Sequence, residues 1–366
     1  MAQTADFVII GGGMAGVSLG AELSKDASVI ILETEKSVGY HSTGRSAAIY
    51  IKNYGNETLR ALNVVSEPFF LEPEGVSDSS LLSPRGELMF ARDFELDTLN
   101  QYLEGSTGMD VITAKEAGEL VPALKTDTVV KAVFEKTAQD IDVDRMLQGY
   151  LKLFRGNGGT LITDAAVQFA KQVDGTWVLN TAAGEFQGRV VVNAAGAWAD
   201  KVADIFGTSR MGIVPMRRSA ALLPKPDYDG FDKWPLLVSA SETFYAKPEA
   251  GLLMVSPADE DPVEPHDAWP EDMVLAEGLY RFEEAVNIPV QRVEHSWAGL
   301  RSFAPDRTPV AGFACDVDNF FWLAGQGGYG IQTAPALSQL ARDLCLTRST
   351  QVSDTVLSAL DPKRFS

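Results

Sequence analysis

The first 33 residues alternate between apolar runs and small or polar residues, and this pattern predicts a strand, a turn, a helix and a second strand. Residues 7–10 form an apolar run, and a glycine-rich turn and an apolar helical stretch through residue 23 follow it. A second apolar run over residues 29–32 stops at Glu33. This order is typical of the first unit of a parallel α/β sheet that binds a nucleotide.

The glycines of the turn have the spacing G-x-G-x-x-G. Gly11 permits a sharp turn off the strand, Gly13 permits the backbone to approach a pyrophosphate, and Gly16 permits close packing of the helix on the sheet. Unpaired N–H groups at the helix N-terminus attract phosphate. Glu33 lies 17 residues after Gly16, near the distance at which an acid binds the ribose hydroxyls. The pattern predicts a dinucleotide site and leaves NAD and FAD both open.

The later segments predict a return to the same sheet. Residues 167–188 alternate about an Asp-Gly turn as an antiparallel ribbon, and residues 189–198 form a buried strand that ends in small residues. Residues 320–324 predict a last strand, followed by a glycine loop and a helix over 331–346. We therefore expect an α/β fold with a Rossmann-like domain and a parallel sheet.

Two intervening regions have a different pattern. Residues 81–90 predict a strand, and helices are expected at 96–103 and 114–120. Residues 211–296 are rich in short strands, among them 243–247, with one helix at 270–286. The expected second domain is a mixed or antiparallel sheet with flanking helices that binds substrate. The predicted bounds are 1–80, 140–210 and 300–366 for the nucleotide domain, and 81–139 and 211–299 for the substrate domain.

Composition narrows the class of protein. The 366 residues, 45% of them hydrophobic, suit two domains with large cores. The net charge of −19 argues against nucleic acid and anionic membrane surfaces as partners, because it repels both. There is no apolar run near 20 residues, and the chain opens directly into the first strand without a targeting segment. A cytoplasmic enzyme without membrane insertion is expected.

No metal site is predicted. The two cysteines are too few for a cysteine-based metal site, and the three histidines lack metal-ligand spacing. Residues 140–144 resemble a calcium loop, but Arg145 stands where that loop needs glycine and Leu151 where it needs an acid. The histidines are His41, His266 and His295.

Four motifs in order carry a resemblance to a known family. They are the fingerprint at 11–16, Ser-Thr-Gly-Arg-Ser at 42–46, Val-Asn-Ala-Ala-Gly-Ala-Trp at 192–198 and Gly-Gln-Gly-Gly-Tyr-Gly at 325–330. The chain resembles the D-amino-acid oxidase and glycine oxidase class of FAD-dependent oxidoreductases. Within that class it looks most like the bacterial FAD-dependent D-arginine dehydrogenases, from Asp6 to Phe365.

The resemblance implies FAD, held non-covalently because Cys315 does not match the cysteine that binds flavin in sarcosine oxidases. It implies pyrophosphate contacts at the first turn, an adenosine contact at Glu33, an adenine contact at Val167, and flavin contacts elsewhere. The implied cofactor residues are Gly11, Gly13, Ala15, Gly16, Glu33, Thr43, Arg45, Ser46, Ala47, Val167, Ala195, Gly196, Gly327, Gly328, Tyr329, Gly330 and Ile331.

For the substrate, the resemblance implies an α-carboxylate bound between Arg218 and Arg301, a geometry that suits a guanidinium fork. Tyrosines close the pocket, the last loop meets the substrate, and Glu87 receives a basic side chain. The remaining residues implied here are Tyr54, Tyr245, Gly328 and Gln332. The implied reaction oxidises a D-amino acid to the imino acid and then the 2-oxo acid, by hydride transfer from Cα to flavin N5.

The chain departs from the D-arginine dehydrogenase pattern at two polar positions. Ile49 replaces a histidine and Ile51 a threonine, and Leu236 and Val238 line the same wall by alignment. These residues favour a more apolar substrate, whereas Glu87 favours a basic one.

Several alternatives stay open at this point. They are a glycine, sarcosine or other secondary-amine oxidase, a glycerol-3-phosphate dehydrogenase relative, and a non-enzymatic FAD-binding protein. The resemblance favours a dehydrogenase over an oxidase, with an amino acid as small-molecule substrate and an electron acceptor that the sequence does not identify.

Overall fold

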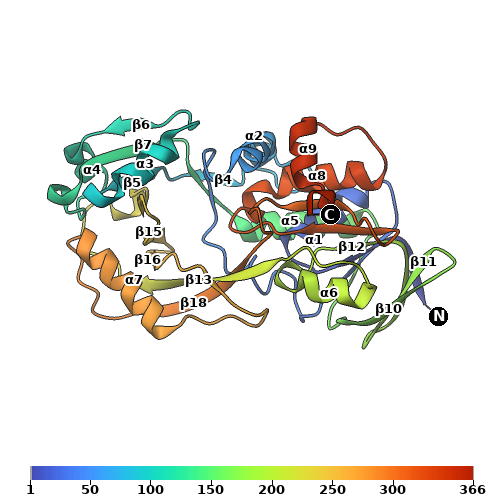
Figure 1. Ribbon diagram of the computed structural model, residues 1–366. Coiled ribbons are helices and arrows are strands. Elements are labelled where there is room, and N and C mark those ends of the chain that lie inside the picture. Colours follow the sequence, from blue (N-terminus) through green and yellow to red (C-terminus); the bar gives the residue numbers. More distant parts are fainter. Residues whose placement is uncertain (1, 366) are drawn as a thin grey trace.

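A computed structural model describes residues 2–365, and two large sheets dominate it (Figure 1). The first sheet has eight strands, and its central strands are parallel. Its strand order is β10 (Val167–Val173), β11 (Thr176–Thr181), β12 (Gly184–Asn193), β1 (Gln3–Ile10), β2 (Val29–Leu32) and β9 (Thr160–Ile162), with β20 (Phe320–Ala324) beside β12 and β19 (Val310–Phe313) beside β20. The α/β fold class predicted from the sequence is confirmed.

Alternate residues of β1 point into two different hydrophobic cores, because successive side chains of a strand point to opposite faces of the sheet. Phe7 and Ile9 pack beneath three helices, and Val8 and Ile10 face the opposite core with helix α6 (Ala199–Phe206). The three helices are α1 (Met14–Leu23), α5 (Val143–Gly156) and α8 (Gly330–Cys345). Burial on both faces explains why the parallel strands are continuous apolar runs.

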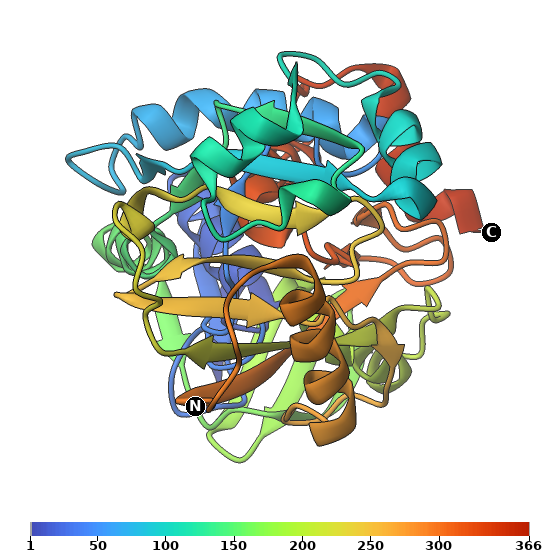
Figure 2. The same cartoon turned by 90° about the vertical axis from the view of Figure 1, so that its left-hand side faces the viewer.

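The second sheet has nine strands and forms the left-hand half of the molecule in Figure 1. Its order is β17 (Asp261–Pro262), β13 (Val214–Leu223), β16 (Leu252–Ser256), β15 (Tyr245–Glu249), β14 (Leu236–Ser239), β5 (Glu87–Ala91), β7 (Lys131–Glu135) and β6 (Asp110–Ile112), with β18 (His295–Phe303) beside β13. Helices α4 (Ala114–Leu120) and α7 (Asp272–Ala285) cover one face, and α7 stands in front of the sheet in Figure 2.

The remaining elements connect these sheets. A small three-stranded sheet joins β3 (Ile49–Tyr50), β8 (Gln139–Ile141) and β4 (Leu82–Pro84). Two further helices of the first half are α2 (Glu57–Leu71) and α9 (Asp354–Leu360), and α3 (Leu96–Leu103) lies beside β5. The strands divide between the sheets nearly as the predicted domain bounds do, although β18 crosses the bound at residue 299. We keep the two-domain division as a proposal.

Two expected strands have different bounds in the structure. The strand expected over 81–90 is split between two sheets, because Gly86 has a φ of +78° and turns the backbone between β4 and β5. The strand expected over 243–247 begins at Tyr245, since Glu242 has a φ of +48° in the turn before it. Strand β19 and helices α6 and α9 were not expected. Within residues 2–365, no helix is long and apolar enough to cross a membrane.

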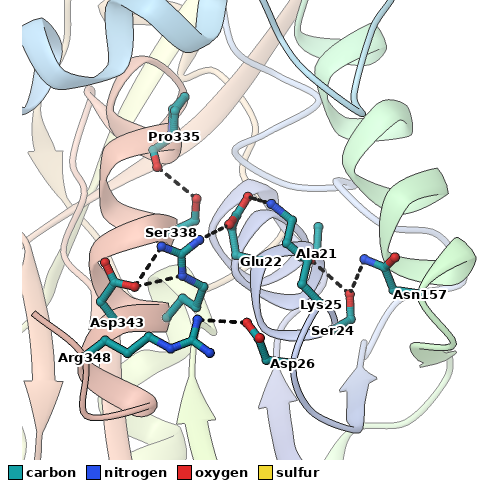
Figure 3. A network of polar contacts seen from close by, with 11 residues as sticks. Ala21, Glu22, Ser24, Lys25, Asp26, Asn157, Pro335, Ser338, Asp343 and Arg348 are labelled. Atoms are coloured by element: carbon teal, nitrogen blue, oxygen red, sulfur yellow. Dashed lines mark hydrogen bonds and ion pairs between the residues drawn. The ribbon is translucent and has the colours of Figure 1, made fainter. Parts of the chain in front are cut away.

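Helices α1 and α8, which begin at the two glycine loops, are tied together near their C-terminal ends by a polar network (Figure 3). Glu22 is 4% exposed and accepts hydrogen bonds from Lys25 Nζ at 2.8 Å and from Arg342 Nη1 at 2.7 Å. Arg342 also binds Asp343, which is 5% exposed. The network fixes the two helices relative to each other.

We predict that Glu22→Ala lowers the free energy of unfolding by about 2 kcal/mol, because it removes a buried carboxylate that binds two cations. Urea unfolding of the purified holoprotein measures the change. Glu119→Ala is the matched control, since it breaks an exposed pair with Lys115 at 3.7 Å and should cost less than about 0.5 kcal/mol. Equal losses in the two variants would contradict the role of the network.

Candidate active site

A large cleft runs between the two sheets, with a volume of about 480 Å³. One end is lined by Glu33, Thr34 and Val167, at the carboxyl edge of the parallel sheet. The other end is lined by Arg218, Tyr245 and Arg301 of the second sheet. The cleft is therefore elongated and joins the predicted nucleotide site to the predicted substrate site.

The N-terminus of α1 forms a cradle in this cleft. A Cβ atom on Gly11 would lie 2.4 Å from the carbonyl oxygen of Ala194, and the φ of Gly11 is +108°. Gly13 precedes the helix without a side-chain cap, and Thr43 Oγ1 accepts the Met14 N–H at 3.0 Å. Among the described residues, the other first-turn N–H groups have no side-chain acceptor, which suits a phosphate.

Glu33 is placed at the end of β2 beside this cradle. Its Oε2 accepts the Gly12 N–H at 2.6 Å and its Oε1 accepts the Glu35 N–H at 2.8 Å. A carboxylate has about four lone-pair sites, so two remain for hydroxyl donors in the cleft. This arrangement fits the adenosine ribose of a dinucleotide.

The second glycine loop places the start of α8 at the middle of the cleft. Gly327, Gly328, Gly330 and Ile331 line the cleft, and the first turn of α8 contains no acidic residue. The positive end of a 16-residue helix therefore faces the cleft. Such a helix end can stabilise negative charge on a bound flavin.

Two arginines lie on one face of the β13–β18 pair. Arg301 stands opposite Met216 and Arg218 stands opposite Gly299, so the arginines are diagonal neighbours in the antiparallel register. Gly299 has no side chain to fill the space between them. Both arginines line the cleft.

The two arginines differ in their partners. Arg218 is 8% exposed and forms a salt bridge with Glu260 at 2.9 Å. Arg301 forms no salt bridge within the described part of the chain, and its Nη1 donates to Tyr54 Oη at 3.1 Å. Gly328 lies directly against Arg301, because a Cβ atom there would be 2.8 Å from Nη1. Arg301 is therefore a cation in the cleft without an anionic partner.

Tyr54, which binds Arg301, is the first of three aromatic residues whose rings contact one another. The Tyr54 and Tyr329 rings are 4.6 Å apart, and the Phe303 and Tyr329 rings are 6.4 Å apart. Burial raises the pKa of the Tyr54 hydroxyl, so this hydroxyl stays protonated. It accepts a hydrogen bond from Arg301 Nη1.

Most residues implied by the resemblance line the cleft, but five do not. Gly16 packs α1 onto the first turn, since a Cβ atom there would be 1.9 Å from the Gly11 carbonyl oxygen. Gln332 is buried and binds the Ile51 N–H and the Asn63 side chain, so its amide supports the 51–63 segment. The five residues are Gly16, Tyr54, Glu87, Tyr329 and Gln332.

Arg45 lines the cleft, but its guanidinium points to another part of the structure than expected. Its Nη1 donates to the carbonyl oxygens of Ala268 and Ala298, both at 3.0 Å, and its Nη2 pairs with Asp267. Arg45 thus ties the 39–48 loop to the second sheet. Its side chain is occupied by these contacts rather than free for a phosphate.

Glu87 is not among the residues that line the cleft. It lies two residues before Met89 on β5, so its side chain is on the face of the strand that packs into the apolar cluster of Met89, Tyr54 and Tyr245. It is 3% exposed, and its Oε2 has no hydrogen-bond partner among the described residues. Burial, and then the neighbouring Glu135, raise the pKa of Glu87 well above its usual range. Both effects favour the protonated form of Glu87.

The cross-strand neighbours of Glu87 are Leu236 on β14 and Glu135 on β7. Ile51, Leu236 and Val238 belong to one apolar cluster. The sequence predicted that these three residues line the substrate pocket, and none of them is among the residues that line the cleft. Tyr102 also packs against this cluster, and its buried hydroxyl has no partner among the described residues. Unsatisfied buried polar groups are rare in native proteins, and a bound molecule is one explanation for them.

Sequence reasoning missed Gln326. This residue lines the cleft, and its buried Nε2 has no partner within the described chain. Its position between two glycines of the last loop was a usable signal, because a side chain there must start at the cleft. Cys315 is exposed and is not among the cleft-lining residues, in keeping with non-covalent binding. Residues 2–365 contain no cluster of histidine, cysteine and acidic residues suited to a metal ion.

The comparison with protein families identifies the class. The profile of the DAO family, FAD-dependent oxidoreductases, matches residues 6–344. The chain belongs to this family of FAD-dependent oxidoreductases, and its cofactor is FAD. The glycine cradle, Glu33 and the two helix N-termini fit that cofactor.

Two relatives and one solved structure show how similar the chain is to individual proteins. The chain is 24% identical to mitochondrial dimethylglycine dehydrogenase of Rattus norvegicus over 99% of this chain, but it spans only 45% of that protein's length. It is 25% identical to the glycerol 3-phosphate dehydrogenase of Caloramator mitchellensis, covering 93% of this chain and 73% of the relative. The structure of glycine oxidase from Geobacillus kaustophilus superimposes with a TM-score of 0.86 at 22% identity, with 99% of each chain covered. The last similarity concerns the fold alone.

We predict that Gly13→Ala yields a folded protein whose affinity for FAD falls at least about tenfold, or about 1.4 kcal/mol. A Cβ atom at Gly13 meets only Thr43 Oγ1, at 3.4 Å, so the methyl group fits the protein but projects into the phosphate cradle. Flavin absorbance after dialysis measures the retained FAD. Gly156→Ala is the control, because nothing lies within 4 Å of its Cβ position; equal FAD content in both variants would contradict the cradle.

Proposed function

We propose that this protein is a cytoplasmic FAD-dependent dehydrogenase of free D-amino acids, similar to the D-arginine dehydrogenases. The observation that carries the proposal is the guanidinium of Arg301, which faces the cleft without a carboxylate partner among the described residues. A cation in such a site needs an anion, because removing a charge from water is costly unless it is paired. An α-carboxylate supplies that charge.

Arg218 and Arg301 together suit a carboxylate better than a neutral amine. Arg218 keeps its Nη1 free of partners within residues 2–365, and the diagonal register places both guanidinium groups on one face. The Tyr54 hydroxyl accepts a hydrogen bond from Arg301 and so helps to fix the position of that guanidinium. Charge-assisted hydrogen bonds from the two guanidinium groups to a carboxylate fix the orientation of the substrate as well as its affinity.

FAD supplies the electron acceptor when it is bound. The chain's own residues bind and orient the amino acid. The carboxylate clamp holds one end of the substrate, and the apolar residues Ala220 and Leu300 of the same strands exclude water from the cleft. The oxidised product is an imino acid, which water hydrolyses to the 2-oxo acid and ammonia.

Anaerobic mixing of the yellow holoprotein with separate D- and L-amino acids tests this function. We expect D-amino acids to bleach the flavin absorbance and the L-enantiomers to leave it unchanged. Subsequent addition of oxygen tests the dehydrogenase assignment, since slow reoxidation is expected of a dehydrogenase. Retention of the yellow colour with every amino acid, amine and glycerol 3-phosphate would point to a non-enzymatic FAD-binding protein instead.

We predict that Arg301→Met lowers kcat/KM for every accepted amino acid by about 100-fold, the loss of two charge-assisted hydrogen bonds of roughly 1.5 kcal/mol each. Anaerobic flavin reduction over a range of substrate concentrations measures the change. Arg210→Met serves as the control, because Arg210 is exposed and pairs with Asp204 away from the cleft. Unaltered turnover in Arg301→Met would exclude the carboxylate clamp.

A second candidate is the oxidation of glycine or an N-methylated glycine. The observation that favours it is the position of Glu87, Ile51 and Val238 outside the cleft lining, which leaves little room beyond Tyr245 for a long side chain. Similarity to a dimethylglycine dehydrogenase is compatible with it. A glycerol 3-phosphate substrate would also use the two arginines but would have no use for Glu87.

The variant Glu87→Gln separates these candidates. If a basic side chain reaches Glu87, the carboxylate form binds it. Because the pKa of Glu87 is raised, the protonated form dominates at lower pH, and the kcat/KM ratio of D-arginine to D-norvaline rises as pH rises through that pKa. We predict that Glu87→Gln abolishes this rise.

Taking the ratio of two substrates removes the titration of the α-amine, which both share. Glycine is the internal control, since it has no side chain to contact residue 87. A ratio that is flat with pH in the wild type, together with glycine as the best substrate, would favour the second candidate.

A further inference from the structure

The guanidinium of Arg218 is held along one edge by residues 257–262, here called the strap. Its Nε donates to the carbonyl oxygen of Asp259 at 2.8 Å, and its Nη2 donates to Glu260 Oε1 at 2.9 Å. Nε and Nη2 form one side of the planar fork. The strap therefore occupies that side and leaves Nη1 for a ligand in the cleft.

The strap is itself fixed to the strand that carries Arg218. The Asp259 carboxylate accepts the Ser219 N–H at 2.6 Å and the Ser219 hydroxyl at 2.9 Å, and its side chain is 2% exposed. Ser256 Oγ donates to the Ser219 carbonyl oxygen at 2.6 Å. These buried contacts hold the Asp259 carbonyl, and with it Arg218, in one position.

Glu260 weakens the electrostatic attraction between Arg218 and a substrate carboxylate. Its carboxylate bonds to the same guanidinium that a substrate carboxylate would bind, so it lowers the positive potential that attracts the substrate. Arg307 lies on the other side of Glu260 and donates from Nη2 to Oε1 at 3.0 Å and to Oε2 at 2.9 Å. Arg307 thus supplies a second cation for the one anion.

Arg307 is also connected to the other arginine of the clamp. Its guanidinium carbon lies 3.9 Å from the centre of the Phe303 ring. Phe303 contacts Tyr329, Tyr329 contacts Tyr54, and Tyr54 binds Arg301. A continuous chain of contacts therefore links Arg301, through Arg307 and Glu260, to Arg218.

We propose that Arg307 is a positioning residue that neutralises Glu260, so that the site around Arg218 keeps a positive potential and Arg218 keeps a free edge for the carboxylate of the substrate. The inference rests on the proposed function, in which the cleft binds a carboxylate. It assigns Glu260 to the orientation of Arg218 and Arg307 to the charge balance of the site. Neither residue touches the substrate in this assignment.

A double-mutant cycle on the holoenzyme tests the proposal. The probe is 3-methylbutanoate, a carboxylate without an amine to oxidise, titrated while the flavin absorbance is followed. The companion measurement is KM and kcat with the best substrate of the wild type. In Arg307→Met, an aliphatic chain still covers Phe303, while Glu260 loses its second cation.

We predict that Arg307→Met raises both KM and the Kd of the probe about fivefold, the upper range for a partly exposed ion pair, with kcat within about twofold. Glu260→Gln in the same chain should restore both constants to near the wild-type values, because it removes the anion that Arg307 neutralised. Arg292→Met, which removes a cation from an exposed pair with Glu294, should change neither.

Two outcomes would overturn the inference. An Arg307→Met enzyme with wild-type KM and Kd would show that Arg218 needs no counter-charge. An Arg307→Met/Glu260→Gln enzyme as weak as the single variant would show that Arg307 acts only through packing. A wild-type holoprotein that binds no carboxylate and oxidises no amino acid would overturn the proposed function and this inference together.

Discussion

The repulsion between two guanidinium groups on one strand pair is the constraint on which the substrate end of the molecule depends. Arg218 and Arg301 are diagonal neighbours across β13 and β18, and both face the cleft. Like charges placed this close need partners or a bound anion. Within residues 2–365, Arg218 has a partner in Glu260, and Arg301 is hydrogen-bonded to a tyrosine hydroxyl without a salt bridge. An anion bound between the two guanidinium groups would reduce their repulsion.

The cofactor end of the cleft must bind a negatively charged molecule within a negatively charged protein. A dinucleotide carries negative charge, and the protein as a whole has a net charge of −19. Backbone groups rather than side-chain cations supply the local positive potential, through the N-termini of α1 and α8. The network around Glu22 and Arg342 fixes the same two helices at their other ends. The two helices that line the cofactor end of the cleft, α1 and α8, thus also pack together on the first sheet.

Two polar residues lie beside the apolar cluster that includes Tyr54 and Tyr245. Glu87 and Tyr102 present buried polar atoms without partners among the described residues. Burial and Glu135 both disfavour the charged form of Glu87 and raise its pKa.

The sequence by itself predicted the first glycine turn and the acid of the cofactor site. Gly11, Gly13 and Glu33 are close in the chain, and their roles follow from backbone conformation and from the period of one strand and one helix. The family resemblance added the two arginines. Tertiary structure alone decided that Gln332 and Arg45 use their side chains for support, and that Glu87 lies behind the cleft. The pairing of Arg307 with Glu260 also follows only from the tertiary structure. Such contacts join residues 47 or more positions apart, and no local pattern encodes them, because they depend on how the two sheets pack.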